Sequence, residues 1–167
     1  MRRSDREAEF TEYVDARRAQ LSRTAYLLCG DSHRAEDLVQ TALVKLYLAW
    51  PRVRKDGNVD AFARRVLVNA HIDETRRPWR RERWGLDGHD EGVAPAETVE
   101  DRDVLLTALA GLPEGQRKVV VLRHFVGLSV EETAHDLGIS AGTVKSQTSS
   151  ALKRLESVLA PDFQGER

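Results

Sequence analysis

The segment from residue 143 to residue 154 is rich in small polar side chains, where an ordinary surface helix would carry Glu and Lys. Short Ser and Thr side chains let a helix approach the floor of the DNA major groove, and Gln can contact adenine through two hydrogen bonds. Lys and Arg suit phosphates, which fix position on the duplex without reading its sequence. The segment therefore predicts a DNA-reading face made of Thr143, Lys145, Ser146, Gln147, Ser149, Ser150, Lys153 and Arg154.

Two short helices joined by a tight turn are expected to position this face. Ser129, with Glu132 three residues later, forms a capping box that begins the first helix. Gly138 ends that helix and Ser140 caps the next. A helix-turn-helix has this layout, although a helical hairpin that merely packs is the alternative. The side chains expected to pack the pair together are Ala134, Leu137, Ile139, Val144 and Leu152.

A second group of polar residues that could contact a polyanion lies on the helix expected over residues 61–77. Phe62, Val66, Leu67 and Ile72 recur at helical intervals and predict the buried side. The segment 76–83 holds five Arg in eight residues, whereas 85–103 holds seven acids and one base. Such a separation of basic from acidic residues is typical of a protein with one surface that binds a polyanion and an acidic linker that stays away from the polyanion. The polar residues on the other side of the helix are Arg64, Arg65, Asn69, Asp73, Arg76 and Arg77.

The helix expected after Gly30 has one broad apolar face and one polar stripe. Asp31 or Ser32 is its N-cap candidate, and Pro51 is expected to stop it. A polar loop with Gly57 as its turn residue then leads to the third helix. The stripe, set by i+3 and i+4 spacing, consists of Asp37, Gln40, Thr41 and Lys45.

These patterns predict an all-α chain of two small helical domains joined by a flexible linker. The expected ranges are 7–84 for the first domain, 85–101 for an acidic, flexible linker and 102–160 for the second. The longest apolar runs are only a few residues and the N-terminus has no apolar core, so neither membrane insertion nor secretion is expected. The single cysteine, Cys29, fits a reducing cytoplasm.

Catalysis is not expected from this sequence. The five histidines are scattered without metal-ligand spacing, and no Gly-rich phosphate loop is present. No cofactor and no metal are therefore predicted. No heptad seam marks a dimer, so we expect a monomer.

The segment "EGQRKVVVLRHFVGLSVEETAHDLGISAGTVKSQTSSALKRL", residues 114–155, closely resembles region 4 of bacterial sigma factors. The segment "AEDLVQTALVKLYLAW" looks like region 2.2, and "FARRVLVNAHIDETRR" resembles regions 2.3 and 2.4. Two sigma domains without a region 3 are similar to the extracytoplasmic-function (ECF, group 4) sigma factors. The details "VLVNAHID" and "GTVKSQTS" look most like the sigma-E-like subgroup common in actinobacteria.

This resemblance implies a promoter-specificity subunit whose partners are core RNA polymerase, promoter DNA and an anti-sigma factor. The second domain would dock on the β flap and read the −35 element. The first would bind the β′ clamp helices through Asp37, Leu38, Gln40, Thr41 and Val44, with Leu48 nearby. The first domain would also recognise the melted −10 element, with a loop near residues 51–60 receiving a flipped base. The −10 residues implied are Arg54, Lys55, Asn58, Arg65, Asn69, Arg76 and Arg77.

Some alternatives stay open at this point. Asp73 matches a family Asp but fits a helix-surface ion pair with Arg76 or Arg77 equally well. Trp79 and Trp84 could stack on bases or pack against the domain. Many relatives have Arg where this chain has Ser150, which predicts a weaker or altered −35 contact. An autonomous helix-turn-helix regulator is the alternative function, and it should bind duplex DNA specifically without polymerase.

Overall fold

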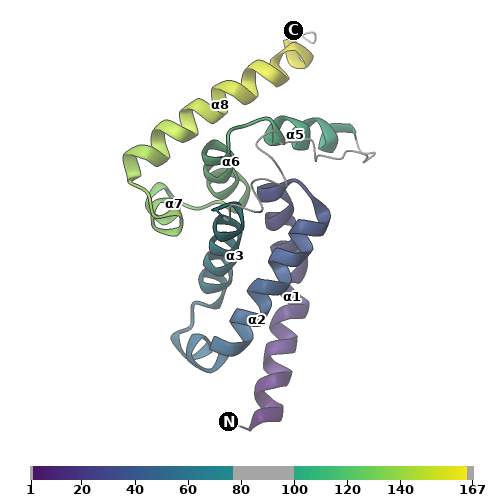
Figure 1. The fold of residues 1–167 in the computed structure, drawn as a ribbon, viewed down its shortest axis with the longest axis vertical. Helices are drawn as coiled ribbons and strands as arrows, with labels where there is room; N and C mark the ends of the chain where they lie inside the picture. Colours follow the sequence, from purple (N-terminus) through teal and green to yellow (C-terminus); the bar gives the residue numbers. More distant parts are fainter. Residues whose placement is uncertain (1, 77–99, 165–167) are drawn as a thin grey trace.

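The computed structural model describes residues 2–76 and 100–164, and every regular element in these ranges is helical. The first three helices lie side by side in the lower part of Figure 1, and the later helices lie above them. The expected all-α class is therefore confirmed. The elements are α1 (Arg3–Cys29), α2 (Ser32–Asp56), α3 (Val59–Arg76), α5 (Glu100–Ala110), α6 (Glu114–Val120), the π-helix η1 (Val121–Val126), α7 (Val130–Leu137) and α8 (Ala141–Gln164).

Side-chain and glycine caps fix the ends of α1 and α2. Gly30 follows α1 in the left-handed conformation, with φ of 75°. The Asp31 carboxylate accepts hydrogen bonds from the backbone N–H groups of His33 and Arg34, at 2.8 and 3.0 Å, and so begins α2. Gly57, with φ of 82°, ends α2.

The expectation that Pro51 stops α2 was wrong, because the helix continues to Asp56. A proline inside a helix removes one backbone donor and its ring crowds the preceding turn. Trp50 and Val53 lie on either side of Pro51 and are both buried in the core of the first unit. Their burial holds the helix on both sides of the proline, so the loop before α3 shrinks to Gly57 and Asn58.

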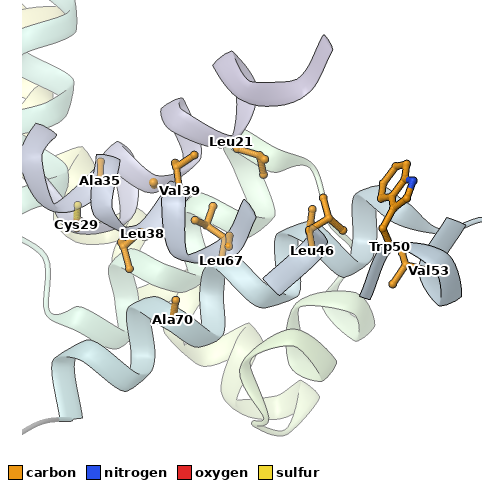
Figure 2. Packing of buried hydrophobic residues seen from close by; sticks show 13 residues of the cluster. Leu21, Cys29, Ala35, Leu38, Val39, Leu46, Trp50, Val53, Leu67 and Ala70 are labelled. Carbon is orange, nitrogen blue, oxygen red and sulfur yellow. The ribbon is translucent and has the colours of Figure 1, made fainter. Parts of the chain in front are cut away.

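The first unit, formed by α1, α2 and α3, has its own apolar core. Figure 2 shows Leu38, Val39 and Leu46 of α2 in one cluster with Leu21 of α1 and Leu67 of α3. Aromatic rings extend the core toward the end of α2: the ring centroids of Phe10 and Trp50 are 5.3 Å apart in an edge contact. This core fixes the faces that α2 and α3 present outward.

The second unit, formed by α5 to α8, contains the expected helix-turn-helix in α7 and α8. The Ser129 hydroxyl accepts from the backbone N–H of Glu132, and the Glu132 carboxylate accepts from the backbone N–H of Ser129, at 3.0 and 2.8 Å. The predicted capping box is therefore present. Within residues 141–159 of α8, the buried residues are Val144 and Ala151, whereas Leu152, expected in the core, is 43 % exposed. Ala151 takes the inward position because it lies seven residues, close to two helical turns, after Val144.

The two units pack directly against each other. Leu28 of α1 and Val68 of α3 are fully buried in a cluster whose other members, including Leu109, Val121 and Leu122, come from the second unit. Figure 1 shows α3 adjoining α6 and α7. Residues 85–99 of the expected linker lie outside the described residues, and residues 100 and 101 belong to α5.

Candidate functional site

The outward face of α8 carries most of the residues predicted to read DNA. The Ser140 hydroxyl accepts from the backbone N–H of Thr143 at 3.0 Å and so fixes the start of the helix. Beyond this cap, exposed hydroxyl side chains lie between cationic ones, so α8 offers groups for base edges and for phosphates together. The exposed members are Lys145, Ser146, Ser149, Ser150, Lys153 and Arg154.

Thr143 and Gln147 are less exposed than the other predicted members of this face. The Thr143 hydroxyl lies 2.9 Å from the Ser140 hydroxyl and belongs to the cap. Gln147 lies against α6, where a Cβ added to Gly115 would come within 3.1 Å of its Nε2 atom. The small residue at position 115 therefore makes room for the Gln147 amide, and in this conformation that amide faces α6.

An exposed stripe runs along α2 and combines polar with apolar side chains. Asp37, Gln40 and Thr41 are exposed at its beginning. Val44 and Leu48 continue it and are 60 % and 74 % exposed. Large apolar side chains at i and i+4 that have no partner form a surface typical of helix docking.

A groove of about 460 Å³ adjoins this stripe and is lined by Lys45, Leu48, Ala49, Pro51 and Arg52. Leu38, predicted to contact polymerase, lies instead in the core of the first unit, only 3 % exposed (Figure 2). Its burial rules out a surface contact in this conformation and gives it a part in holding the stripe in place.

The end of α2 holds two of the residues predicted at the −10 surface. Arg54 forms an ion pair with Glu9 of α1, which also accepts a hydrogen bond from the Trp50 indole at 3.2 Å. The hydrogen bond from Arg54 holds the pKa of the Glu9 carboxyl below its ordinary value. Arg54 thus has a protein carboxylate as its partner, whereas the neighbouring Lys55 is exposed.

A groove of about 500 Å³ lies between α1 and the turn that joins α2 to α3. Its lining includes Glu12, Tyr13, Trp50, Arg54 and Asn58. The Tyr13 hydroxyl donates to Asp60 at 2.6 Å. Burial, and after it this hydrogen bond, raises the pKa of Tyr13, so the phenol stays a neutral donor. The groove has an aromatic wall and an exposed amide at Asn58, the kinds of group that hold an unstacked base.

Helix α3 exposes Asn69 and leaves Arg65 partly buried. Arg76 is the last residue of α3, and Arg77 lies outside the described residues together with Trp79 and Trp84. Asp73 is exposed, and its alternatives stay open because its proposed cation partners lie at or beyond the end of the helix.

The opposite side of α3 makes polar contacts with the second unit that the sequence analysis missed. The Arg64 Nε donates to Asp136 Oδ2 of α7 at 2.7 Å, and these side chains are only 18 % and 2 % exposed. His71 Nε2 lies 2.7 Å from Glu114 Oε2 of α6. Asp136 lies one turn from Thr133 on the buried side of α7. Because Asp is rarely buried unless it is paired, its position in the sequence could have indicated a buried ion pair. Nothing in the sequence indicated which cation was its partner.

The Glu114 carboxyl shows the electrostatics of this contact. Burial raises its pKa, but the hydrogen bond and charge of His71, with Arg117 and Lys118, outweigh burial and lower it to about 2. Arg117 also donates to the backbone oxygen of Leu28 at 3.1 Å, where a cation suits the end of α1. Polar groups therefore hold α6 against both α1 and α3.

Two family profiles match the chain. "Sigma-70 region 2" matches residues 13–81 and "Sigma-70, region 4" matches residues 102–155. The RNA polymerase sigma-E factor of Streptomyces avermitilis is 43 % identical over 157 residues, which cover 90 % of this chain and 85 % of that protein. The sigma-E factor of Streptomyces coelicolor is 42 % identical over 162 residues, covering 93 % and 89 %.

Solved structures agree with these matches. The sigma factor RpoE of Bartonella quintana, in complex with the anti-sigma factor NepR, superposes with a TM-score of 0.77 at 27 % identity, covering 91 % of this chain and 97 % of that one. CnrH, in complex with the cytosolic domain of CnrY, gives a TM-score of 0.62 at 25 % identity, covering 93 % and 90 %. With both sigma regions matched in order and the arrangement of helices shared, this chain belongs to the sigma-70 family, as an extracytoplasmic-function sigma factor of the sigma-E type.

Proposed function

We propose that this sigma factor reads the −35 element as duplex DNA through the outward face of α8. The observation that carries this proposal is the exposed run of Ser146, Ser149 and Ser150 flanked by Lys145, Lys153 and Arg154. Hydroxyl groups hydrogen-bond to base edges at short range, and the cations hold phosphates on both sides of the groove. Gln147 joins this face only if its amide leaves Gly115 when DNA binds.

Core RNA polymerase is the proposed partner of the α2 stripe. The β′ clamp helices would pack on Val44 and Leu48, and Asp37, Gln40 and Thr41 would supply the polar edge of that contact. The second unit would dock on the β flap. The support for this assignment is the exposure of two large apolar side chains one turn apart on a helix whose other face is buried.

The melted −10 element is assigned to the surface around Asn58 and Asn69. A flipped base would enter the groove beside Asn58, and exposed cations such as Lys55 would follow the backbone. Arg54 would join them only by exchanging Glu9 for a phosphate. Arg65, Arg76 and Arg77 complete the proposed set.

An anti-sigma factor is the proposed regulator of this chain. RpoE and CnrH, which share its arrangement of helices, were solved with NepR and with the cytosolic domain of CnrY. The described residues contain no helix long and apolar enough to cross a membrane. Within the same ranges no group of three or more acidic, His or Cys side chains could hold a metal. We propose that the protein works beside polymerase in the cytoplasm and performs no catalysis of its own.

Run-off transcription tests the proposal. Purified core polymerase would be incubated with a pool of promoter fragments, with and without this chain. Transcripts that start at a discrete site and depend on the chain are expected, and their start sites locate both promoter elements. If core polymerase neither binds the chain nor initiates with it, the assigned polymerase and promoter surfaces are wrong.

A further inference from the structure

The contact between Gly115 of α6 and Gln147 of α8 depends on the missing side chain of the glycine. Gly115 lies in the first turn of α6 and is not among the glycines with a positive φ, so any residue could adopt its backbone conformation. Glycine is a poor helix former, so the backbone gives no reason for it here. A Cβ at this position would lie 3.1 Å from Nε2 and 3.8 Å from Cδ of Gln147. What Gly115 provides is therefore space for the Gln147 amide.

Gln147 lies at the border between the buried and the DNA-facing sides of α8. Val144 and Ala151, three residues before it and four after it, are buried. Ser150, three residues after it, is exposed on the predicted reading face. Residues three and four apart are neighbours on a helix, so a side chain at this border adjoins both sides. Rotation of the flexible Gln147 side chain is enough to turn its amide from α6 toward DNA.

The position beside Gly115 is one that the amide can leave without losing a hydrogen bond. In the described part of the chain no protein group is hydrogen-bonded to the Gln147 amide, and the side chain is only partly buried. By contrast, the neighbouring Thr148 hydroxyl is fixed by a bond to the backbone oxygen of Val144 at 2.7 Å. Water can bind the Gln147 amide in either position, so neither position leaves a buried polar group unpaired.

We propose that Gly115 is a specificity-determining residue: the space beside it lets Gln147 withdraw from the promoter, so the chain tolerates more than one base at the −35 position that Gln147 faces. This inference rests on the proposed reading of the −35 element by α8. A Gln amide pairs with adenine through two hydrogen bonds. Opposite another base, an amide that cannot move leaves polar groups unpaired, whereas an amide that returns to Gly115 avoids that cost.

Nuclear magnetic resonance of the free chain tests the contact without polymerase or DNA. One α hydrogen of Gly115 takes the place of a Cβ, so we expect a nuclear Overhauser effect between it and the amide hydrogens of Gln147. The signal that Gln147→Ala removes identifies this amide. Gly115→Leu should shift the signal toward that of a solvent-exposed Gln. Gly111→Leu, the matched control after α5, should leave it unchanged, because a Cβ there meets nothing nearer than 3.5 Å.

Run-off transcription with each holoenzyme, on tagged promoter fragments with a randomised −35 element, tests the base reading. The position that Gln147 faces is the one where Gln147→Ala changes the base preference. There Gly115→Leu should raise the preference for adenine about tenfold over the wild type, toward the discrimination of a full Gln–adenine pair. Gly111→Leu should keep the wild-type preference. The double variant Gly115→Leu/Gln147→Ala should behave like Gln147→Ala, which excludes a direct effect of the new Leu on DNA.

The outcomes separate this role of Gly115 from the sigma function. If the folded wild type shows no Overhauser effect, or Gly115→Leu leaves the amide signal in place, the contact is overturned. If Gly115→Leu loses helix content by circular dichroism, Gly115→Ala decides the same questions, because its Cβ still requires the amide to move by a few tenths of an ångström. An unchanged base preference, or a sharper one that survives in the double variant, overturns the role in specificity. If the wild-type holoenzyme does not initiate, the proposed function and the base reading both fall, while the Overhauser effect still decides where the amide lies.

Discussion

Leu48 offers a direct test of the polymerase surface, because at 74 % exposure it contributes little to the fold. Full burial of a Leu side chain is worth about 1.5–3 kcal/mol. Since about a quarter of Leu48 is already covered and Ala keeps one methyl group, Leu48→Ala should cost about 1–2 kcal/mol of binding free energy. That loss weakens affinity for core polymerase about 5- to 30-fold.

The assay is a titration of the labelled chain with purified core polymerase, together with denaturant unfolding of each variant. Leu48→Met keeps the apolar volume and should bind like the wild type. Leu46→Ala, two residues away and fully buried, is the opposite control. It should lower the free energy of unfolding by about 2–5 kcal/mol, whereas Leu48→Ala should change it by less than about 0.5 kcal/mol.

Two results would contradict this prediction. If Leu48→Ala binds core polymerase as tightly as the wild type while Leu46→Ala shows the expected instability, the assay works and the stripe is a solvated face. If Leu48→Ala instead lowers the free energy of unfolding as much as Leu46→Ala does, the exposure of Leu48 in the structure is wrong.

Three further predictions concern single residues. Lys145→Ala or Lys153→Ala should weaken promoter binding at every sequence and reduce the slope of log affinity against log salt by about one; an unchanged slope removes the residue from the phosphate contacts. Asn69→Ala should spare assembly with polymerase but impair promoter opening in permanganate footprints; lost assembly would mean that Asn69 supports the fold. The pKa of Glu114 is lower in the folded chain than in the unfolded one, so its carboxylate contributes stability above pH 4.5 that is lost as the pH falls toward 2. The difference in unfolding free energy between wild type and Glu114→Gln should therefore shrink over that range in urea titrations.

Local sequence rules predicted the helices and their ends because the interactions that set them are themselves local. Gly30 at the end of α1 and the Ser129–Glu132 capping box involve residues close together in the chain. Pro51 does not end α2, because tertiary packing of Trp50 and Val53 on α1 and α3 decides its effect. Leu152 was misplaced for a similar reason, since periodicity shows that one face is buried but fixes its centre only to within a residue or so. The polymerase contact of Leu38 came from the family resemblance, and the burial of Leu38 in the core of the first unit does not fit it.

The contact between the two units could not be predicted from the same patterns. Leu28 and Val68 fit the apolar periodicity of α1 and α3, but periodicity does not say which element covers a residue. The partners in the two polar contacts, Arg64 with Asp136 and His71 with Glu114, are 72 and 43 residues apart along the chain. Pairing at such distances requires the fold, and one sequence carries no signal that connects the two sides.

The apolar and the polar contacts of this seam contribute unequally to the packing of the two units. Exposing Leu28 and Val68 on opening costs about 3–6 kcal/mol, taking about 1.5–3 kcal/mol for each buried side chain as an upper estimate. The facing residues of the second unit also pack on one another in the same cluster, so they keep part of their contacts. Buried ion pairs such as Arg64–Asp136 add little net stability, because separation returns both charges to water.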